Sequence, residues 1–291
     1  MIPSSLPIAG CMRWGLWGAH FSTNEYFTLI NECLQQDITC FDHADIYGGY
    51  TTEAEFGKAL RLDASIRCKM QIVTKCGICM MDENRPSHQI KSYDTTAAHI
   101  ISSAENSLKN FDTDYIDLFL IHRPSPLLNP HEIAEAIEQL KKAGKILHFG
   151  VSNFLPHQVN MLNKFIKVEY NQTEISILNL PPFTNGILDN CLENVITPMA
   201  WAPLGGGIFT DDSHPRFRAI VKEGEALAAK YSTGINQILI AWLLNHPSFI
   251  IPVVGTTKIE RLIQAKEAFS IKLSQQDWFR LYTASLGEDV A

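Results

Sequence analysis

The sequence predicts an α/β protein that folds as a single-domain (β/α)8 (TIM) barrel over residues 1–291. Short apolar segments alternate with helical patterns from end to end, about eight of each. A doubly wound open sheet would also alternate, but it would normally carry a glycine-rich phosphate loop after a strand. Neither GxGxxG nor GxxxxGK[ST] occurs in the sequence, which favours the barrel.

The expected strands are short, and several are apolar almost throughout. This composition is typical of a parallel sheet that is covered on both faces. In chain order the expected strands span residues 8–14, 39–44, 71–76, 116–122, 146–152, 167–173, 196–202 and 249–254.

Three of the intervening helices have clear sequence signatures. Residues 23–36 place apolar side chains at helical spacing, and residues 95–110 open with threonine caps before a similar stripe. Residues 130–145 begin with proline, carry acids early and lysines late, and stop at Gly144. This polarity suits the helix dipole and the usual start and stop residues.

Composition limits the class of protein. The formal net charge is −7 and no basic tract is interleaved with aromatics, so neither nucleic acid nor an anionic membrane is an expected partner. The N-terminal segment does not read as a signal peptide, and no apolar stretch approaches the length of a membrane span. Seven irregularly spaced cysteines indicate reduced thiols and a cytoplasmic protein.

Unusual polar residues fall where successive strands end. Asp42 closes the second strand and runs into Tyr47, Lys75 closes the third, and His122 closes the fourth. Buried Asp and Lys are rare in cores and need partners. Because chemistry in such a barrel sits at the carboxyl ends of the strands, these four residues are the candidate catalytic group.

Their chemical types indicate carbonyl chemistry. A neighbouring ammonium lowers the pKa of a tyrosine, and a carboxylate can hold that ammonium in place. Asp42, Lys75 and Tyr47 can form this chain, with Tyr47 as general acid and His122 donating to a carbonyl oxygen. None of these side chains supplies a hydride, so a nicotinamide cofactor is expected.

Two other interpretations use the same region. Asp42, His43 and Asp45 could be metal ligands. However, Lys75 would point a cation at that site, and strand alternation turns His43 outward if Asp42 points inward. No metal site is therefore expected. Cys76 and Cys79 form a CxxC that could be redox-active, but without a helix at the first cysteine two plain reduced thiols are expected.

Six segments, in order along the chain, resemble the aldo-keto reductase superfamily, and bacterial oxidoreductases in particular. They are "FDHADIYGG", "TKCG", "LIHRP", "GVSNF", "NQTE" and "PLGGG". The resemblance implies a barrel that binds NADP(H) without a Rossmann domain. It also implies a catalytic tetrad of Asp42, Tyr47, Lys75 and His122.

The resemblance also implies a cofactor site. Its residues would be Ser152, Asn153 and Gln172 at the carboxamide, Trp201 stacked on the nicotinamide, Leu204 and Gly206 at the pyrophosphate, and Thr256, Lys258 and Arg261 at the adenosine phosphate. A helix start with two cations suits a 2′-phosphate, which favours NADP(H) over NAD(H). The sequence departs from the family pattern at Gly255, where many members have Lys, and at Ala265, where many have Asn.

Several residues near the expected mouth keep two interpretations each. Trp14 could line the substrate pocket or be an ordinary core aromatic, and Arg123 could bind a substrate acid or pair with a nearby carboxylate. Gly48 and Gly49 are expected in a turn with positive φ. Residues 203–217, which are rich in glycine at their start, could close over the cofactor as a lid.

The sequence therefore predicts an NADPH-dependent reductase of aldehydes or ketones. It is expected to act as a monomer on a small carbonyl substrate. The alternatives are a cofactor-sensing subunit that binds NADPH but turns over slowly, and a metal-dependent hydrolase.

Overall fold

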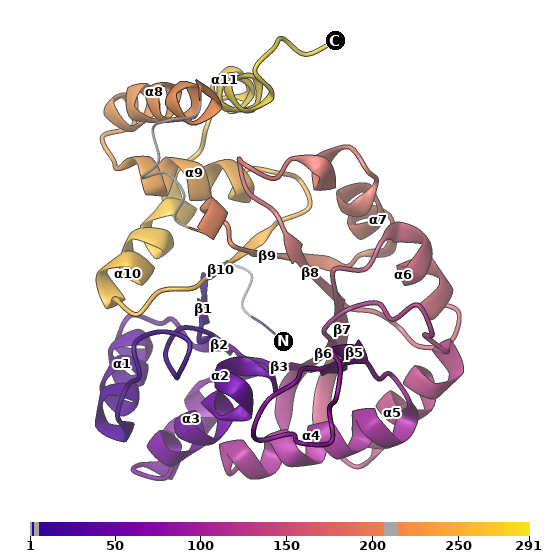
Figure 1. Ribbon diagram of the computed structural model, residues 1–291. Coiled ribbons are helices and arrows are strands. Elements are labelled where there is room, and N and C mark those ends of the chain that lie inside the picture. Colours follow the sequence, from indigo (N-terminus) through magenta and orange to yellow (C-terminus); the bar gives the residue numbers. More distant parts are fainter. Residues whose placement is uncertain (1, 3–5, 207–214) are drawn as a thin grey trace.

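The computed structural model describes residues 2, 6–206 and 215–291 and contains a closed barrel of eight parallel strands (Figure 1). The order around the barrel is β1-β10-β9-β8-β7-β6-β3-β2. The strands are β1 (Ile8–Gly10), β2 (Cys40–Asp42), β3 (Gln71–Cys76), β6 (Ile116–Ile121), β7 (Ile146–Ser152), β8 (Tyr170–Glu174), β9 (Thr197–Trp201) and β10 (Ile251–Val254). The predicted (β/α)8 class is confirmed.

The helices surround this barrel. They are α1 (Thr23–Gln35), α2 (Tyr47–Tyr50), α3 (Thr52–Leu60), α4 (Ala97–Phe111), α5 (Pro130–Lys142), α6 (Pro156–Leu162), α7 (Ile187–Asn194), α8 (Pro215–Lys230), α9 (Ile235–Leu244), α10 (Ile259–Glu267) and α11 (Gln275–Leu286). Helices α8 and α11 pack against each other beyond α9, outside the ring (Figure 1). No helix in the described ranges is long and apolar enough to cross a membrane.

The three helix predictions are confirmed, and the caps explain where these helices begin. Ser22 accepts from the backbone N–H of Glu25 and forms a capping box ahead of α1. Thr96 caps α4, and Asn129 caps α5 immediately before Pro130 at the first helical position. Each cap satisfies a backbone donor that the first helical turn would otherwise leave free.

Two features of the sheet differ from the sequence-based expectation. β1 ends at Gly10 instead of continuing to residue 14, because the chain turns away directly after it. An additional antiparallel pair, β4 (Ile78–Cys79) with β5 (Ser92–Tyr93), follows β3 and was not expected. Strands of two residues carry too little periodicity to be seen in a sequence.

The interior of the barrel is a packed apolar core. Ile8, Val73, Leu118, Tyr170 and Met199 belong to one buried cluster, in which strands from opposite sides of the barrel meet. Ile2 joins this cluster, and its backbone N–H donates to the hydroxyl of Tyr170, 3.3 Å away. With the interior filled, polar chemistry is confined to the end of the barrel where the strands finish.

Candidate active site

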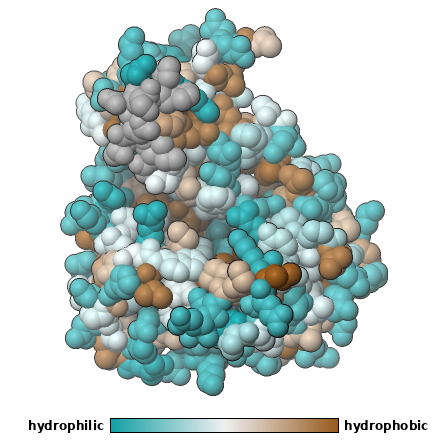
Figure 2. Space-filling view, in the orientation of Figure 1, coloured by the Kyte–Doolittle hydropathy of each residue, from teal (hydrophilic) through white to brown (hydrophobic). Residues whose placement is uncertain are grey.

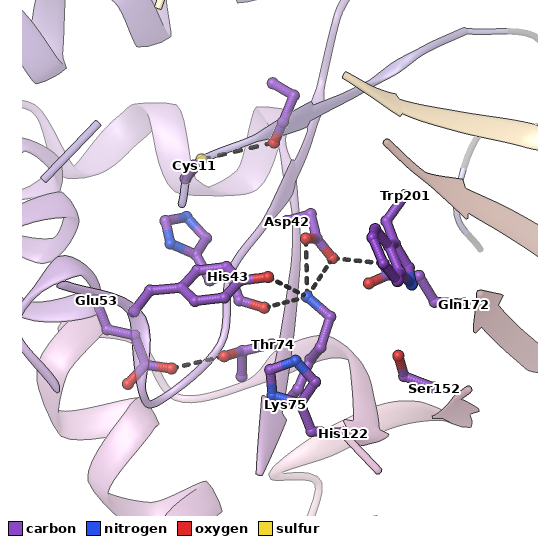
Figure 3. Close-up of polar contacts among 12 residues, drawn as sticks. Cys11, Asp42, His43, Glu53, Thr74, Lys75, His122, Ser152, Gln172 and Trp201 are labelled. Atoms are coloured by element: carbon purple, nitrogen blue, oxygen red, sulfur yellow. Dashed lines mark hydrogen bonds and ion pairs between the residues drawn. The ribbon is translucent and has the colours of Figure 1, made fainter. Parts of the chain in front are cut away.

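An ion pair between Asp42 and Lys75 forms the centre of the candidate site. Lys75 Nζ lies 2.8 Å from both carboxylate oxygens of Asp42, and both side chains are almost completely buried (Figure 3). The two residues belong to the paired strands β2 and β3. Lys75 Nζ also donates to the backbone oxygen of His43 at 2.6 Å. Both charges therefore have the partners that a buried ion pair requires.

Tyr47 completes a chain with this pair. Its hydroxyl is 3.3 Å from Lys75 Nζ, and the ammonium lies 5.1 Å from the ring centroid. The turn that brings Tyr47 back over the barrel uses Gly48 and Gly49, with φ of 60° and 64°. The prediction of positive φ at this glycine pair is confirmed. A side chain there would be strained, and at Gly48 a Cβ would lie 2.5 Å from Thr52 Oγ1.

His122 follows β6 and stands beside Tyr47, with ring centroids 6.1 Å apart in an edge-on arrangement. Burial, reinforced by the positive charges of Lys75 and Arg123, holds the pKa of His122 well below its usual value. The imidazole is therefore neutral at physiological pH. Its Nδ1 has no hydrogen-bond partner within the described part of the chain. One nitrogen of a neutral imidazole carries a proton, and through it the ring can donate to a carbonyl oxygen.

The pKa of Tyr47 differs from the sequence-based expectation. Burial raises the pKa of Tyr47, and the nearby Lys75 ammonium lowers it without overcoming that effect. Burial alone would lower the pKa of Lys75, but Asp42 and Tyr47 outweigh it, so the pKa of Lys75 is raised. At neutral pH the pair is therefore a protonated phenol beside an ammonium, which is the proton-donating form.

The residues expected at the carboxamide and nicotinamide adjoin this group. Gln172 Nε2 donates to Asp42 Oδ1 at 2.7 Å, and Asn153 Nδ2 donates to Ser152 Oγ at 2.7 Å. Trp201 Nε1 donates to Asn153 Oδ1 at 3.0 Å. Figure 3 shows Ser152, Gln172 and Trp201 on one side of the Asp42–Lys75 pair. Strands β7, β8 and β9 thus bring amide, hydroxyl and indole groups to one side of the Asp42–Lys75 pair.

The residues expected at the phosphates lie on neighbouring loops. Leu204 packs against the core, and Gly206 has φ of 70°. Thr256 is buried, and its Oγ1 accepts from the backbone N–H of Lys258 at 3.2 Å. Lys258 and Arg261 are exposed at the start of α10, and within the described ranges neither forms an ion pair. Of the suggested lid, residues 207–214 lie outside the described residues.

The interpretation of Trp14 as a wall of the substrate pocket is wrong. Its side chain is fully buried among Tyr26, Phe41 and Phe56, and its Nε1 donates to the backbone oxygen of Thr256 at 2.8 Å. The early end of β1 folds this residue inward. Trp17 is instead the exposed aromatic next to Tyr47, with centroids 6.2 Å apart. No local pattern in the sequence distinguishes Trp14 from Trp17.

The side chains of His43, Cys76 and Cys79 lie outside the group around Lys75. His43 points to the helix side of the barrel wall, where its ring packs edge-on against Phe56 and Phe111. Among the described residues no three His, Cys, Asp or Glu side chains could hold a metal ion together. Burial raises the pKa of both Cys76 and Cys79, which favours thiols over reactive thiolates.

Two contacts of the site were not predicted from the sequence, although both residues were considered. Gln172 was assigned only to the cofactor, yet it shares Asp42 with Lys75. Arg123 lies with its guanidinium carbon 5.8 Å from the Trp201 ring centroid, although the two residues are far apart in sequence. Their position at neighbouring strand ends was the available signal, but the direction of each side chain could not be read from it.

A (β/α)8 barrel with a contacting Asp-Lys-Tyr chain and a neutral histidine at its mouth is typical of a class of oxidoreductase. The model of the Aldo/keto reductase family matches residues 8–285, and the chain belongs to this family. It is 45% identical to the "Uncharacterized oxidoreductase YcsN" of Bacillus subtilis, over 97% of this chain and 95% of that protein. It is 40% identical to a "6-dehydroglucose reductase" of Agrobacterium fabrum, over 96% of this chain and 95% of that protein.

Solved structures show the same fold. The thermostable aldo-keto reductase Tm1743, crystallised with the inhibitor epalrestat, has a TM-score of 0.80 and 29% identity, over 97% of this chain and 95% of that one. An aldo/keto reductase from Klebsiella pneumoniae, in complex with NADP and acetate, has a TM-score of 0.77 and 23% identity. That likeness covers 94% of this chain and 89% of the other.

Proposed function

We propose that this oxidoreductase uses NADPH to reduce an aldehyde or ketone to the alcohol, with Tyr47 as the general acid. The observation that carries the proposal is the contact of Lys75 Nζ with both Asp42 and the Tyr47 hydroxyl, beside neutral His122. These groups can hold and protonate a carbonyl oxygen but cannot reduce carbon. A nicotinamide, when bound, supplies the hydride.

The described residues fit such a cofactor. Gln172, Ser152 and Asn153 present polar groups beside the catalytic chain, and Trp201 offers a ring face. On the phosphate side of the proposed cofactor site, Lys258 and Arg261 are exposed cations at the start of α10. Neither has a carboxylate partner among the residues described. Two free cations at a helix N-terminus suit a phosphate, which supports NADP(H) over NAD(H).

The chain's own residues would act on the carbonyl in a defined order. His122 donates a hydrogen bond to the carbonyl oxygen and orients it towards the Tyr47 hydroxyl. As negative charge develops on that oxygen, Tyr47 transfers its phenolic proton and the alcohol forms. The phenolate that remains is stabilised by the adjacent Lys75 ammonium, which Asp42 holds in place.

The proposal is tested by Tyr47→Phe, which removes the proton donor and keeps the ring. The rate of NADPH oxidation with an aldehyde should fall by about 10²–10⁴-fold, since general acid catalysis contributes this much. Cofactor binding, followed by fluorescence titration, should change little. A variant that reduces a good aldehyde at the wild-type rate would disprove the assignment of Tyr47.

The cofactor assignment has its own test. Parallel titrations with NADPH and NADH should show tighter binding of NADPH, and Arg261→Met should reduce that difference because it removes a cation at the 2′-phosphate. A protein that binds NADPH tightly but reduces none of a broad aldehyde panel would instead be the cofactor sensor.

We also propose that the protein works as a monomer in the cytoplasm on a small carbonyl compound. Its seven free cysteines, six of them buried, and its net charge of −7 support this setting. Light scattering after size exclusion should give a mass near 32.7 kDa. A mass of twice that value would disprove the monomer.

A further inference from the structure

Arg123 is a half-buried cation at the mouth of the barrel, and no carboxylate of the described residues pairs with it. It directly follows His122 at the end of β6, and its guanidinium lies over the ring of Trp201. No hydrogen bond or ion pair joins it to another residue in the described part of the chain. Arg67, which is a structural arginine, contrasts with it: Arg67 donates to Asp117 at 2.8 Å and to two backbone oxygens.

The contact with Trp201 orients the guanidinium without using its hydrogen-bonding capacity. A ring face attracts the cation electrostatically and takes up none of its five N–H donors. Trp201 is itself held by its hydrogen bond to Asn153. The N–H donors of Arg123 therefore stay available for a ligand. A half-buried charge without a hydrogen-bonded partner costs free energy, which such a ligand would offset.

Arg123 also supplies positive charge next to the reacting position. The charge of Lys75 is opposed by Asp42 at 2.8 Å, whereas Arg123 has no such counter-charge among the described residues. Its field reaches His122, because it is one of the groups that hold the pKa of that imidazole low. Figure 2 shows the face above the barrel, with hydrophilic residues spread over much of it.

We propose that Arg123 is the residue with which this site recognises its substrate, and that the substrate carries oxygen acceptors close to the reacting carbonyl. This inference rests on the proposed carbonyl reductase function and names the substrate class. Two neighbouring hydroxyls, as in a sugar aldehyde, or one carboxylate can each accept from the planar fork of a guanidinium. An unsubstituted alkyl aldehyde would shield the Arg123 guanidinium from water without offering its N–H groups a hydrogen-bond acceptor.

The test compares matched pairs of aldehydes at saturating NADPH. Glyceraldehyde is paired with propanal, and succinic semialdehyde is paired with butanal, so each pair differs mainly in the acceptor group. The wild-type enzyme should favour the acceptor-bearing member of at least one pair by about 10-fold or more in kcat/KM, since a hydrogen bond to a charged group is worth this much. The pair that shows the preference identifies hydroxyls or carboxylate as the acceptor.

Arg123→Met, which keeps most of the stem and removes the donors, should abolish that preference mainly through KM. Its kcat/KM with propanal and butanal should stay within about 3-fold of the wild-type value. A larger loss with these two substrates would indicate that the variant impairs catalysis itself and not only a substrate contact. Arg123→Lys should retain part of a preference for the carboxylate, which a point charge can attract. It should lose a preference for hydroxyls, which depends on the fork.

Arg85→Met is the matched control. Arg85 also lies over an aromatic ring, with its guanidinium carbon 4.4 Å from the centroid of Tyr50, but it donates to the backbone oxygen of Asn84. This variant should keep the substrate preference, and all variants should keep the melting temperature of the wild type.

Two results would overturn the role of Arg123. In the first, the wild type reduces both members of each pair equally well. In the second, Arg123→Met lowers activity on all four aldehydes by the same factor, which would mean that Arg123 acts through His122. If the wild type oxidises NADPH with none of the four, the proposed reductase function fails as well, and the two failures are thus distinguishable.

Discussion

Two buried carboxyl groups, Asp42 and Glu53, lie on opposite faces of the same barrel wall. Asp42 faces the mouth and meets the Lys75 ammonium and the Gln172 amide. Glu53, in α3, faces the outer side of β3. There it accepts from Thr74 at 2.6 Å, from Ser107 at 2.8 Å and from Asn110 at 3.0 Å (Figure 3 shows the contact with Thr74).

The partners of the two groups differ in charge, and this difference separates their roles. Burial raises the pKa of Glu53, outweighing three hydrogen bonds from neutral donors that lower it. On the mouth side the Lys75 ammonium pairs with the Asp42 carboxylate. The same ammonium also contacts the Tyr47 hydroxyl. Alternation along β3 places Thr74 outward and Lys75 inward, so one residue of this strand contacts the helix layer and the next belongs to the proposed catalytic group.

The largest effect that tests this comparison is expected from Lys75→Met. Among the described residues it leaves the buried Asp42 with the Gln172 amide as its one side-chain partner. Breaking a buried ion pair in this way costs about 3–5 kcal/mol of unfolding free energy. Urea unfolding at pH 7 should show this loss, and carbonyl reduction should fall together with it because Tyr47 loses its neighbouring cation.

The double variant Asp42→Asn, Lys75→Met is the control. It removes both charges, so it should be more stable than Lys75→Met alone. If the single variant proved as stable as the double variant, the ion pair would not be what holds this part of the barrel.

A smaller effect is expected from Glu53→Gln on the outer face. At neutral pH the loss should be about 1–3 kcal/mol or less, because the amide keeps an acceptor for Thr74 and Ser107 but turns a donor towards Asn110. Activity should stay at the wild-type level, since the described partners of Glu53 are Thr74, Ser107 and Asn110, none of which belongs to the proposed catalytic group.

The pH dependence gives a sharper test of Glu53. Because its pKa is raised in the folded protein, its contribution to stability is fully present below the unfolded value near 4.5 and is lost as the pH rises through the folded value. The stability of the wild type relative to Glu53→Gln should therefore decline from pH 4.5 towards neutrality. A difference that is constant over this range would contradict the raised pKa.

The sequence predicted the fold class, and the proximity of the four residues proposed as catalytic, for a physical reason. Parallel strands end at one edge, so Asp42, Lys75 and His122 at successive strand ends had to meet. The wrong predictions concern the directions of side chains, which depend on contacts with residues distant in the sequence. Trp14 was misplaced because nothing local shows that β1 stops at Gly10, or that the indole reaches the backbone oxygen of Thr256.

The net direction of the Tyr47 pKa shift could also not be predicted from the sequence. The effect of Lys75 on Tyr47 was predicted with the correct sign, but the opposing effect of burial depends on how tightly the mouth is packed. Glu53 could not be distinguished from an exposed helix acid, because its partners Ser107 and Asn110 come from α4, more than fifty positions along the chain.

The smallest effect is expected from His43→Leu, which tests the outer face without removing a bonded partner. Both ring nitrogens of His43 are buried with no hydrogen-bond partner in the described residues, and the ring packs against Phe56 and Phe111. Replacing an unsatisfied polar ring by an apolar side chain should change the unfolding free energy at pH 7.5 by no more than about 1 kcal/mol.

Acidification should separate the His43→Leu variant from the wild type. Burial, aided by Lys75, lowers the pKa of His43 to about 3, whereas an unfolded histidine protonates near pH 6.5. The wild type should therefore lose stability as the pH falls below 6.5, by up to about 1.4 kcal/mol per pH unit from this group. Urea unfolding at pH 7.5 and pH 5 should show a shallower loss in the variant. Equal losses in both proteins would mean that His43 binds a proton in the folded state, and the outer face would then hold a charge just as the mouth does.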